Sequence, residues 1–269
     1  MTAFAANSLL CRLALANLEI DAASFASIRI LSGALALWLL VKFQGTKTEA
    51  NGNWRSAFAL FSYATAFSYA YINLSAGTGA LLLFGAVQST MILYGLRSGE
   101  RLNLWQSAGF VLALLGLIVF MLPGISTPSL IDSILMIGAG IAWGAYSLLG
   151  KGAKKPLEMT AGNFLRAVPF AVGFSILMMS QVHLSGMGIL LATLSGAIAS
   201  GMGYAIWYLV VRETTTTNSA IMQLSVPVIA GIGGIAFLDE AVTLHQLISA
   251  LAILMGIAVV ILKPNQKHR

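Results

Sequence analysis

The sequence predicts an all-α integral membrane protein, a bundle of ten helices built from two inverted five-helix repeats. Of its 269 residues, 58% are hydrophobic and only 9% are charged, whereas soluble domains have about 45–50% apolar and about 25% charged residues. Long apolar segments follow one another, and the second half of the chain repeats the pattern of the first. Because these runs do not alternate with polar residues, they indicate helices rather than the strands of a membrane barrel.

The apolar segments give the expected helices. A membrane-spanning helix needs about 20 mostly apolar residues, and nearly all of the segments approach that length. The expected helices cover residues 1–11, 23–41, 55–74, 79–96, 104–122, 131–150, 159–180, 187–211, 218–238 and 244–262. Their connections are short and leave no room for a soluble domain.

The first segment is shorter than the others. Ser8-Leu-Leu-Cys-Arg12 is similar to Ser147-Leu-Leu-Gly-Lys151, which closes the segment 131–150. We therefore expect Arg12 to mark the end of the first helix, and eleven residues before it are too few to span a bilayer. The first helix is accordingly expected to lack roughly its first half at the N-terminus. The segment has neither the basic leader nor the cleavage pattern of a signal peptide.

Basic residues occur in every second connection. The connections near Ser75, Pro128, Gln181 and Asp239 contain no lysine or arginine. The alternate connections and the C-terminal tail contain Lys42, Lys47, Arg55, Arg97, Arg101, Lys151, Lys154, Lys155, Arg212, Lys263, Lys267 and Arg269. The positive-inside rule then predicts a cytoplasmic N-terminus and C-terminus. The net charge of +6 indicates topology and attraction to the lipid bilayer, not nucleic-acid binding.

The repeat appears when the chain is shifted by 140 positions, which aligns Glu100 with Glu240 and Gln106 with Gln246. The expected repeats cover residues 1–123 and 130–263. Five helices in the first repeat make the second enter the membrane from the opposite face. Inverted repeats of this kind build many secondary transporters, with a substrate site near the midplane.

A family resemblance rests on the Ile-Arg step of the second helix, Gly-Glu-Arg-Leu at 99–102, AFAANSLLCRLAL and GTGALLLFGAVQSTMILYG. The chain resembles the EamA family of the drug/metabolite transporter superfamily, and within it the bacterial aromatic amino-acid exporters. The resemblance implies ten helices, a central cavity and metabolite export across the bacterial inner membrane. Pro227 matches a proline common in the corresponding helix of that family.

Polar and aromatic residues inside the expected helices are the candidates for a substrate cavity, expected between helices one, three, four, six, eight and nine. These candidates are Asn7, Ser8, Tyr71, Gln88, Tyr94, Trp143, Tyr146, Trp207, Tyr208 and Gln223. Rings can stack on an apolar substrate while polar groups bind its other end. For each residue, an interfacial position or a helix contact is the alternative.

Charged residues and prolines near or within the helices have structural or gating interpretations. Glu100 and Glu240 match the paired glutamates of the family, and each is expected to oppose a helix dipole, with ion coupling as the alternative. Arg29 and Arg166 occupy matching helices and either line the cavity or reach the interface. Pro169, Pro227 and nearby glycines supply bends for rocking motions.

These observations favour a secondary transporter that exports amino acids, aromatic ones included, or similar small metabolites by alternating access. No apolar segment has a central Asp or Glu, so we expect exchange or substrate-gradient transport. Neither a cofactor nor a metal nor a catalytic group is expected, and Cys11 is the single cysteine. The alternatives are export of a different metabolite or drug, a membrane enzyme acting on lipid-linked substrates, and a membrane scaffold without transport. A monomer and a homodimer both remain open.

Overall fold

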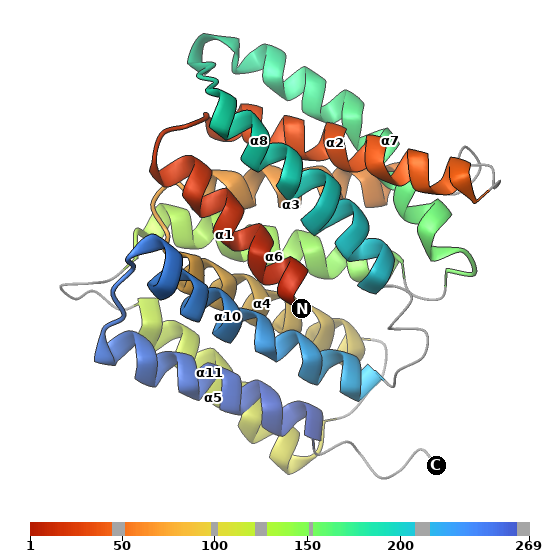
Figure 1. The fold of residues 1–269 in the computed structure, drawn as a ribbon. Helices are drawn as coiled ribbons and strands as arrows, with labels where there is room; N and C mark the ends of the chain where they lie inside the picture. Colours follow the sequence, from red (N-terminus) through yellow and green to blue (C-terminus); the bar gives the residue numbers. More distant parts are fainter. Residues whose placement is uncertain (45–51, 98–101, 122–127, 151–152, 208–215, 263–269) are drawn as a thin grey trace.

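The computed structural model describes residues 1–44, 52–97, 102–121, 128–150, 153–207 and 216–262, which are almost entirely helical (Figure 1). The helices are α1 (Thr2–Ala16), α2 (Ala22–Phe43), α3 (Trp54–Ala70), α4 (Ala76–Arg97), α5 (Leu104–Met121), α6 (Leu130–Leu149), α7 (Pro156–Leu177), η1 (Met179–Gln181), α8 (Gly186–Leu194), η2 (Ser195–Met202), α10 (Thr216–Leu238) and α11 (Leu244–Leu262). The π-helical η2 continues α8, and we call Gly186–Trp207 the α8 segment. The predicted all-α fold class is confirmed.

Helix boundaries follow from polar caps. Asp21, Asn53 and Ser185 each accept a hydrogen bond from a backbone N–H three residues later, at the starts of α2, α3 and α8. The starts of α5 and α11 share a reciprocal capping box, Asn103 with Gln106 in one and Thr243 with Gln246 in the other. The glutamine repeated at the 140-residue offset therefore begins the same helix in both repeats.

Helix packing follows the same repeat. Helices α2, α4 and α5 pack against α7, α10 and α11, their counterparts in the second repeat. Several other contacts come in exchanged sets: α3–α6 with α8–α1, α4–α6 with α10–α1, and α3–α7 with α8–α2. Exchanging the two repeats therefore maps these helix contacts onto one another, as expected for an inverted repeat.

The two ends of the bundle differ in their connections. Met1 lies at the end that we call the amino-terminal end. The other end, at the left of Figure 1, carries the connections α1–α2, α3–α4, α7–α8 and α10–α11, and we call it the opposite end. The long helices joined by these connections therefore run antiparallel to each other.

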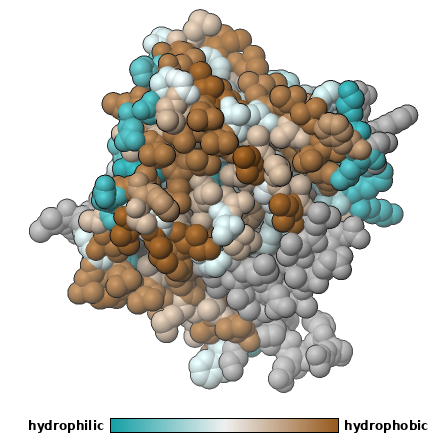
Figure 2. Space-filling model, in the orientation of Figure 1, coloured by the Kyte–Doolittle hydropathy of each residue, from teal (hydrophilic) through white to brown (hydrophobic). Residues whose placement is uncertain are grey.

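The outer surface suits a lipid environment. Large apolar side chains such as Leu35, Ile134 and Ile232 are more than half exposed. Figure 2 shows apolar residues over most of one face, with hydrophilic residues toward the two ends. Five helical stretches are long and apolar enough to cross a membrane, namely 22–43, 76–97, 130–149, 156–177 and 186–207, and the described chain also contains shorter apolar helices.

Close helix packing depends on glycines in several contacts. A Cβ built on Gly140 would meet the Leu83 carbonyl oxygen at 2.5 Å, and one on Gly109 would meet that of Gly256 at 2.6 Å. The GxxxG pair at Gly140 and Gly144 therefore faces α4, as expected for small residues between membrane helices.

The first helix differs from the prediction. It continues for four residues beyond Arg12 and ends at Ala16. The prediction that Arg12 marks the end of this helix is therefore wrong. Arg12 instead lies one turn inside, where its side chain reaches the α3–α4 connection.

Candidate functional site

A buried arginine lies at the centre of the bundle. Arg29, in α2, is only 2% exposed. Its Nε donates to the Ser200 hydroxyl at 3.0 Å, and its Nη2 donates to the hydroxyls of Tyr63 at 2.9 Å and Tyr204 at 3.4 Å. The guanidinium carbon also lies 4.9 Å from the ring centre of Tyr63 and 4.8 Å from that of Phe67. The charge is therefore surrounded by hydroxyls and rings contributed by α3 and the α8 segment.

An amide extends this network to α1. Asn7 donates from Nδ2 to the Tyr63 hydroxyl at 3.4 Å, and its Oδ1 accepts from the Ser195 hydroxyl at 2.6 Å. Hydrogen bonds thus connect α1, α2, α3 and the α8 segment in the interior. The two amide hydrogen bonds orient Asn7, since they assign its donor and acceptor atoms different partners.

The π-helical turn in the α8 segment places two serines in this network. Ser195 and Ser200 would lie about 140° apart around a regular α-helix. In the π-helix Ser195–Met202, residues five apart come round to the same side. Ser195 can therefore bond Asn7 while Ser200 bonds Arg29. π-Helical turns occur frequently at functional sites.

Next to the arginine lies a small cavity. Its lining comes from α1, α3, α4, α6 and the α8 segment, and consists of Phe4, Asn7, Ser8, Tyr63, Phe67, Leu83, Phe84, Trp143 and Tyr204. The free space is about 10 Å³, close to the volume that one water molecule needs. Side chains therefore nearly fill the cavity in this conformation. Among the side chains of α10 that the structure describes, none lines this cavity.

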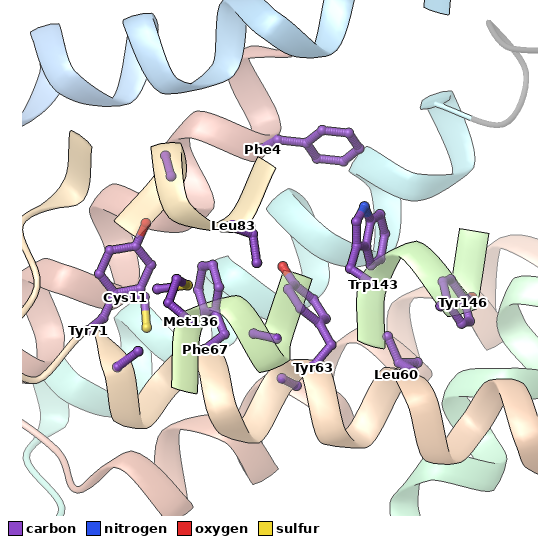
Figure 3. Packing of buried hydrophobic residues seen from close by; sticks show 14 of the residues in the cluster. Phe4, Cys11, Leu60, Tyr63, Phe67, Tyr71, Leu83, Met136, Trp143 and Tyr146 are labelled. Carbon is purple, nitrogen blue, oxygen red and sulfur yellow. The ribbon is translucent and has the colours of Figure 1, made fainter. Parts of the chain in front are cut away.

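Aromatic rings form most of the cavity wall. Trp143 lies 4.6 Å from Tyr204, 5.0 Å from Tyr63 and 6.2 Å from Phe4, between ring centres. Phe4 also contacts Trp207 edge-on at 5.8 Å. Figure 3 shows Phe4, Tyr63 and Trp143 converging from three helices. Such a wall suits the flat apolar part of a small molecule.

Acidic side chains in the described residues lie near helix ends, away from this cavity. Glu158 pairs with Lys155 in the first turn of α7, at 2.8 Å. Asp132, in the first turn of α6, accepts from the Asn73 amide at 2.9 Å. Within the described part of the chain, Arg29 has hydroxyls and rings as partners but no carboxylate.

Glu240 connects the repeats at the opposite end. Its carboxylate accepts from the backbone N–H of Ala76, the first residue of α4, at 2.8 and 3.0 Å, and from Arg12 Nε at 3.3 Å. Arg12 also donates to the carbonyls of Tyr71 and Ile72, at 3.1 and 2.6 Å. As expected, Glu240 opposes a helix dipole, but that of α4 rather than α11, which follows it in the chain.

Three more side-chain contacts at this end join the repeats, beside backbone hydrogen bonds from Asp21 to His183 and from Ser185 to Glu19. The Ser185 hydroxyl donates to Glu19, and the His183 backbone N–H donates to Asp21 at 3.0 Å. The Asn73–Asp132 contact is the third. Together with Glu240 they form what we call the inter-repeat lock, because each contact joins a residue of the first half to one of the second. The lock closes the opposite end of the bundle.

Several predicted cavity residues lie together. Asn7, Ser8 and Trp143 line the cavity, and Trp207 contacts Phe4 beside it. Tyr146 is buried and stacks on Trp143 at 5.4 Å.

Other predicted cavity residues lie elsewhere. Tyr71 is buried at the end of α3, where its hydroxyl donates to the Ala76 carbonyl at 3.2 Å. Gln88 and Gln223 are buried, but neither is among the described lining residues. Tyr94 is 54% exposed, so the structure does not bring it to the cavity. Tyr208 lies outside the described residues.

The residues predicted to have structural or gating roles lie in different parts of the structure. Arg29 reaches the central network, whereas its repeat counterpart Arg166 donates to the Gly162 carbonyl within α7 at 3.0 Å. Pro169 and Pro227 lie inside α7 and α10, as predicted. Glu100 lies outside the described residues.

Sequence reasoning missed Phe4, Tyr63, Phe67 and Tyr204. Tyr63, Phe67 and Tyr71 are spaced four residues apart along α3, which puts them on one helix face. That stripe was available in the sequence, although a buried packing face gives the same pattern.

Comparisons with known proteins agree with this architecture. The EamA-like transporter family matches residues 1–122 and again residues 130–262. An uncharacterized protein of Pseudomonas aeruginosa is 51% identical over 262 residues, 97% of this chain and 91% of that protein. A protein of Escherichia coli K12 named a probable amino-acid metabolite efflux pump is 26% identical over 209 residues, 71% of this chain and 70% of that protein.

More distant matches extend over nearly the whole chain. An uncharacterized transporter of Archaeoglobus fulgidus is 22% identical, over 92% of this chain and 90% of that protein. A solved crystal structure has a TM-score of 0.68 at 18% identity, with 97% of this chain and 98% of that chain covered, and shows that the fold is shared. The two family matches and the 51% identical relative show that this chain belongs to the EamA-like transporter family of membrane proteins.

Proposed function

We propose that the protein is a secondary transporter of the bacterial inner membrane that exports amino acids or similar small metabolites by alternating access. The observation that carries this proposal is the position of the cavity. It lies between the two repeats, and the inter-repeat lock closes the bundle at one end. A cavity at the interface of inverted repeats is the arrangement that rocking of one repeat against the other requires.

The distribution of basic residues indicates which side of the membrane the lock faces. Lys42, Arg55 and Lys155 lie at the amino-terminal end of the bundle, near the ends of α2, α3 and α7. By the positive-inside rule this end faces the cytoplasm. The lock is then on the outer side, and its contacts must separate when the cavity opens outward.

The residues of the cavity wall support amino acids as the class of substrate. Trp143, Phe4 and Tyr204 offer apolar rings, while Asn7 and Tyr63 offer polar atoms. An amino acid with a large side chain presents both kinds of surface. The relative from Escherichia coli, named a probable amino-acid metabolite efflux pump, supports the same class.

The proposed cycle uses relative motion of the repeats. With the lock closed, the substrate enters from the amino-terminal end and displaces the rings that now fill the cavity. Release on the other side needs the Arg12–Glu240 ion pair and the contacts beside it to break. Because a central acidic residue is not among the described lining, we propose exchange or the substrate gradient as the driving force.

Counterflow in proteoliposomes tests this function. Vesicles containing the purified protein are preloaded with unlabelled tryptophan, phenylalanine, threonine or a neutral drug, and uptake of the radiolabelled compound is followed. We expect saturable uptake of an amino acid only in preloaded vesicles. Empty liposomes and vesicles preloaded with buffer are the controls.

The same preparation separates the other functions. Absence of flux with every compound, from protein shown to be folded, would contradict the transport proposal and favour a scaffold. Turnover of a lipid-linked substrate by that protein would favour a membrane enzyme. Counterflow of the drug alone would replace amino acids as the cargo class.

A further inference from the structure

Among the residues that the structure describes, the buried charge of Arg29 has no carboxylate beside it. Arg29 is buried, and its Nη1 has no hydrogen-bond partner in the described structure. Its other donors meet three neutral hydroxyls. A buried cation without a carboxylate is costly, and ionisable groups inside membrane proteins usually pair with one another or mark a substrate path.

We propose that the cavity takes a monoanionic organic carboxylate with an aromatic or large apolar body, and that Arg29 binds the carboxylate. A free ammonium group on the ligand is not required. This inference rests on the proposed transport function and names the chemistry of its substrate class. Amino acids then bind through their carboxylate, and N-acylated amino acids or arylalkanoates bind as well.

The donors around the cavity fit one end of such a ligand. Guanidinium groups bind carboxylates through two parallel N–H groups, and Arg29 has one such group unused. The Tyr63 hydroxyl accepts from Arg29 and from Asn7, so its own proton is available to a ligand oxygen. A carboxylate could therefore receive hydrogen bonds from charged and neutral donors together.

The apolar body of the ligand would contact aromatic rings. Phe4, Phe67, Trp143 and Tyr204 line the cavity, and no acidic side chain is among its described lining residues. An amine without a carboxylate would bring a second positive charge near Arg29 and find no carboxylate there. The cavity thus favours anions over cations of the same shape.

The cavity has room for about one water molecule in this conformation. The ligand-bound form therefore requires the repeats to separate, or the rings around Arg29 to change rotamer. Arg29 itself is not among the described lining residues, so this movement has to open the cavity to its Nη1, which is now shielded from solvent. Binding and opening are consequently coupled in the same region.

Direct binding to purified protein in lipid nanodiscs tests the inference with probes that share one skeleton. The probes are 3-phenylpropionate, N-acetylphenylalanine, phenylalanine, 3-phenylpropan-1-ol and phenethylamine, each measured by calorimetry. We expect the carboxylates to bind at least about tenfold more tightly than the alcohol or the amine, because hydrogen bonds between charged groups are the stronger kind. N-acetylphenylalanine should bind at least as tightly as phenylalanine.

Two variants of Arg29 test whether this residue causes the preference for carboxylates. Arg29→Gln should abolish the difference between 3-phenylpropionate and 3-phenylpropan-1-ol, whereas Arg29→Lys should keep part of it. Arg166→Gln is the matched control, because it removes the same charge from the counterpart helix, where the side chain bonds within α7. That variant should keep the preference of the unmodified protein.

Three results would overturn the inference. Phenethylamine could bind the unmodified protein as tightly as 3-phenylpropionate, or the carboxylate preference could survive in Arg29→Gln. The third is no binding of any carboxylate by a protein that shows counterflow of another compound. The probe series on unmodified protein decides the matter even if Arg29→Gln does not fold. Absence of counterflow of every tested compound by the unmodified protein would instead count against the transport function itself.

Discussion

Tyr63 is the residue through which the central network is joined. Its hydroxyl accepts hydrogen bonds from Arg29 in α2 and Asn7 in α1, while its ring lies 5.0 Å from that of Trp143 in α6. One side chain of α3 thus contacts a charge, an amide and the aromatic wall. Removing only the hydroxyl separates the polar role of Tyr63 from its packing role.

We predict that Tyr63→Phe weakens substrate binding about tenfold or more, since a hydrogen bond to a charged group contributes about 1.5–3 kcal/mol. The Km of counterflow should rise, while the melting temperature in detergent changes little because the ring remains. Tyr69→Phe is the control, on the same helix but lining a separate groove near Phe174. Equal effects of the two variants would contradict the role given to Tyr63.

Several site residues could be predicted individually from the sequence, and others could not. Asn7, Trp143 and Arg29 stand out because polar, aromatic or charged groups in apolar helices are unusual. Tyr63 and Tyr204 do not, because tyrosines at membrane interfaces are common. Their function depends on neighbours distant in sequence, such as Arg29 at 34 and 175 positions away.

Among the elements, the π-helical turn of the α8 segment is notable because it packs closely against α2. Gly196 lies against α2, and a Cβ there would meet the carbonyl oxygen of Arg29 and the hydroxyl of Ser32. The sequence SGAIASGM predicts a helix with close packing. It does not predict the π-turn, because no local pattern distinguishes that turn from an α-helix.

At this contact, Gly196→Ala should destabilise the protein by about 1–3 kcal/mol, the usual cost of overpacking, and should impair transport by displacing Arg29. Thermal unfolding and counterflow measure the two effects. Gly173→Ala is the matched control, since a Cβ on that helical glycine would meet nothing within 4 Å. A Gly196→Ala protein as stable and active as Gly173→Ala would contradict this account.

At the scale of the whole molecule, the repeat was predictable because the capping glutamines and apolar runs recur at a fixed offset. The lock was not. Glu240 was expected to act on the helix that follows it, but its partner is the first residue of α4, 164 positions earlier. Only the folded arrangement of the two repeats brings these ends together.

The lock leads to a prediction that uses the single cysteine. Cys11 is buried beside Arg12 at the opposite end. Glu240→Gln removes the charge that Arg12 and the start of α4 share, so the closed form should lose stability. Labelling of Cys11 by a small maleimide in nanodiscs should accelerate about tenfold, as expected for the loss of about 1.4 kcal/mol.

Glu158→Gln is the control for that labelling experiment. It also removes a paired carboxylate, but its partner Lys155 belongs to the same repeat. Labelling of Cys11 should stay slow in this variant. Acceleration in both variants would indicate general loosening rather than opening of the lock.

The central claim, that transport requires the repeats to separate at the lock, is tested most directly by cross-linking. Asn73→Cys and Asp132→Cys, introduced with Cys11→Ala, place one thiol in each repeat where a 2.9 Å hydrogen bond now joins them. A short bis-thiosulfonate reagent should abolish counterflow, and a reductant should restore it. Lys155→Cys with Glu158→Cys, both in one repeat, should transport before and after the reagent. Full counterflow by the Asn73–Asp132 cross-linked protein would contradict alternating access between the repeats.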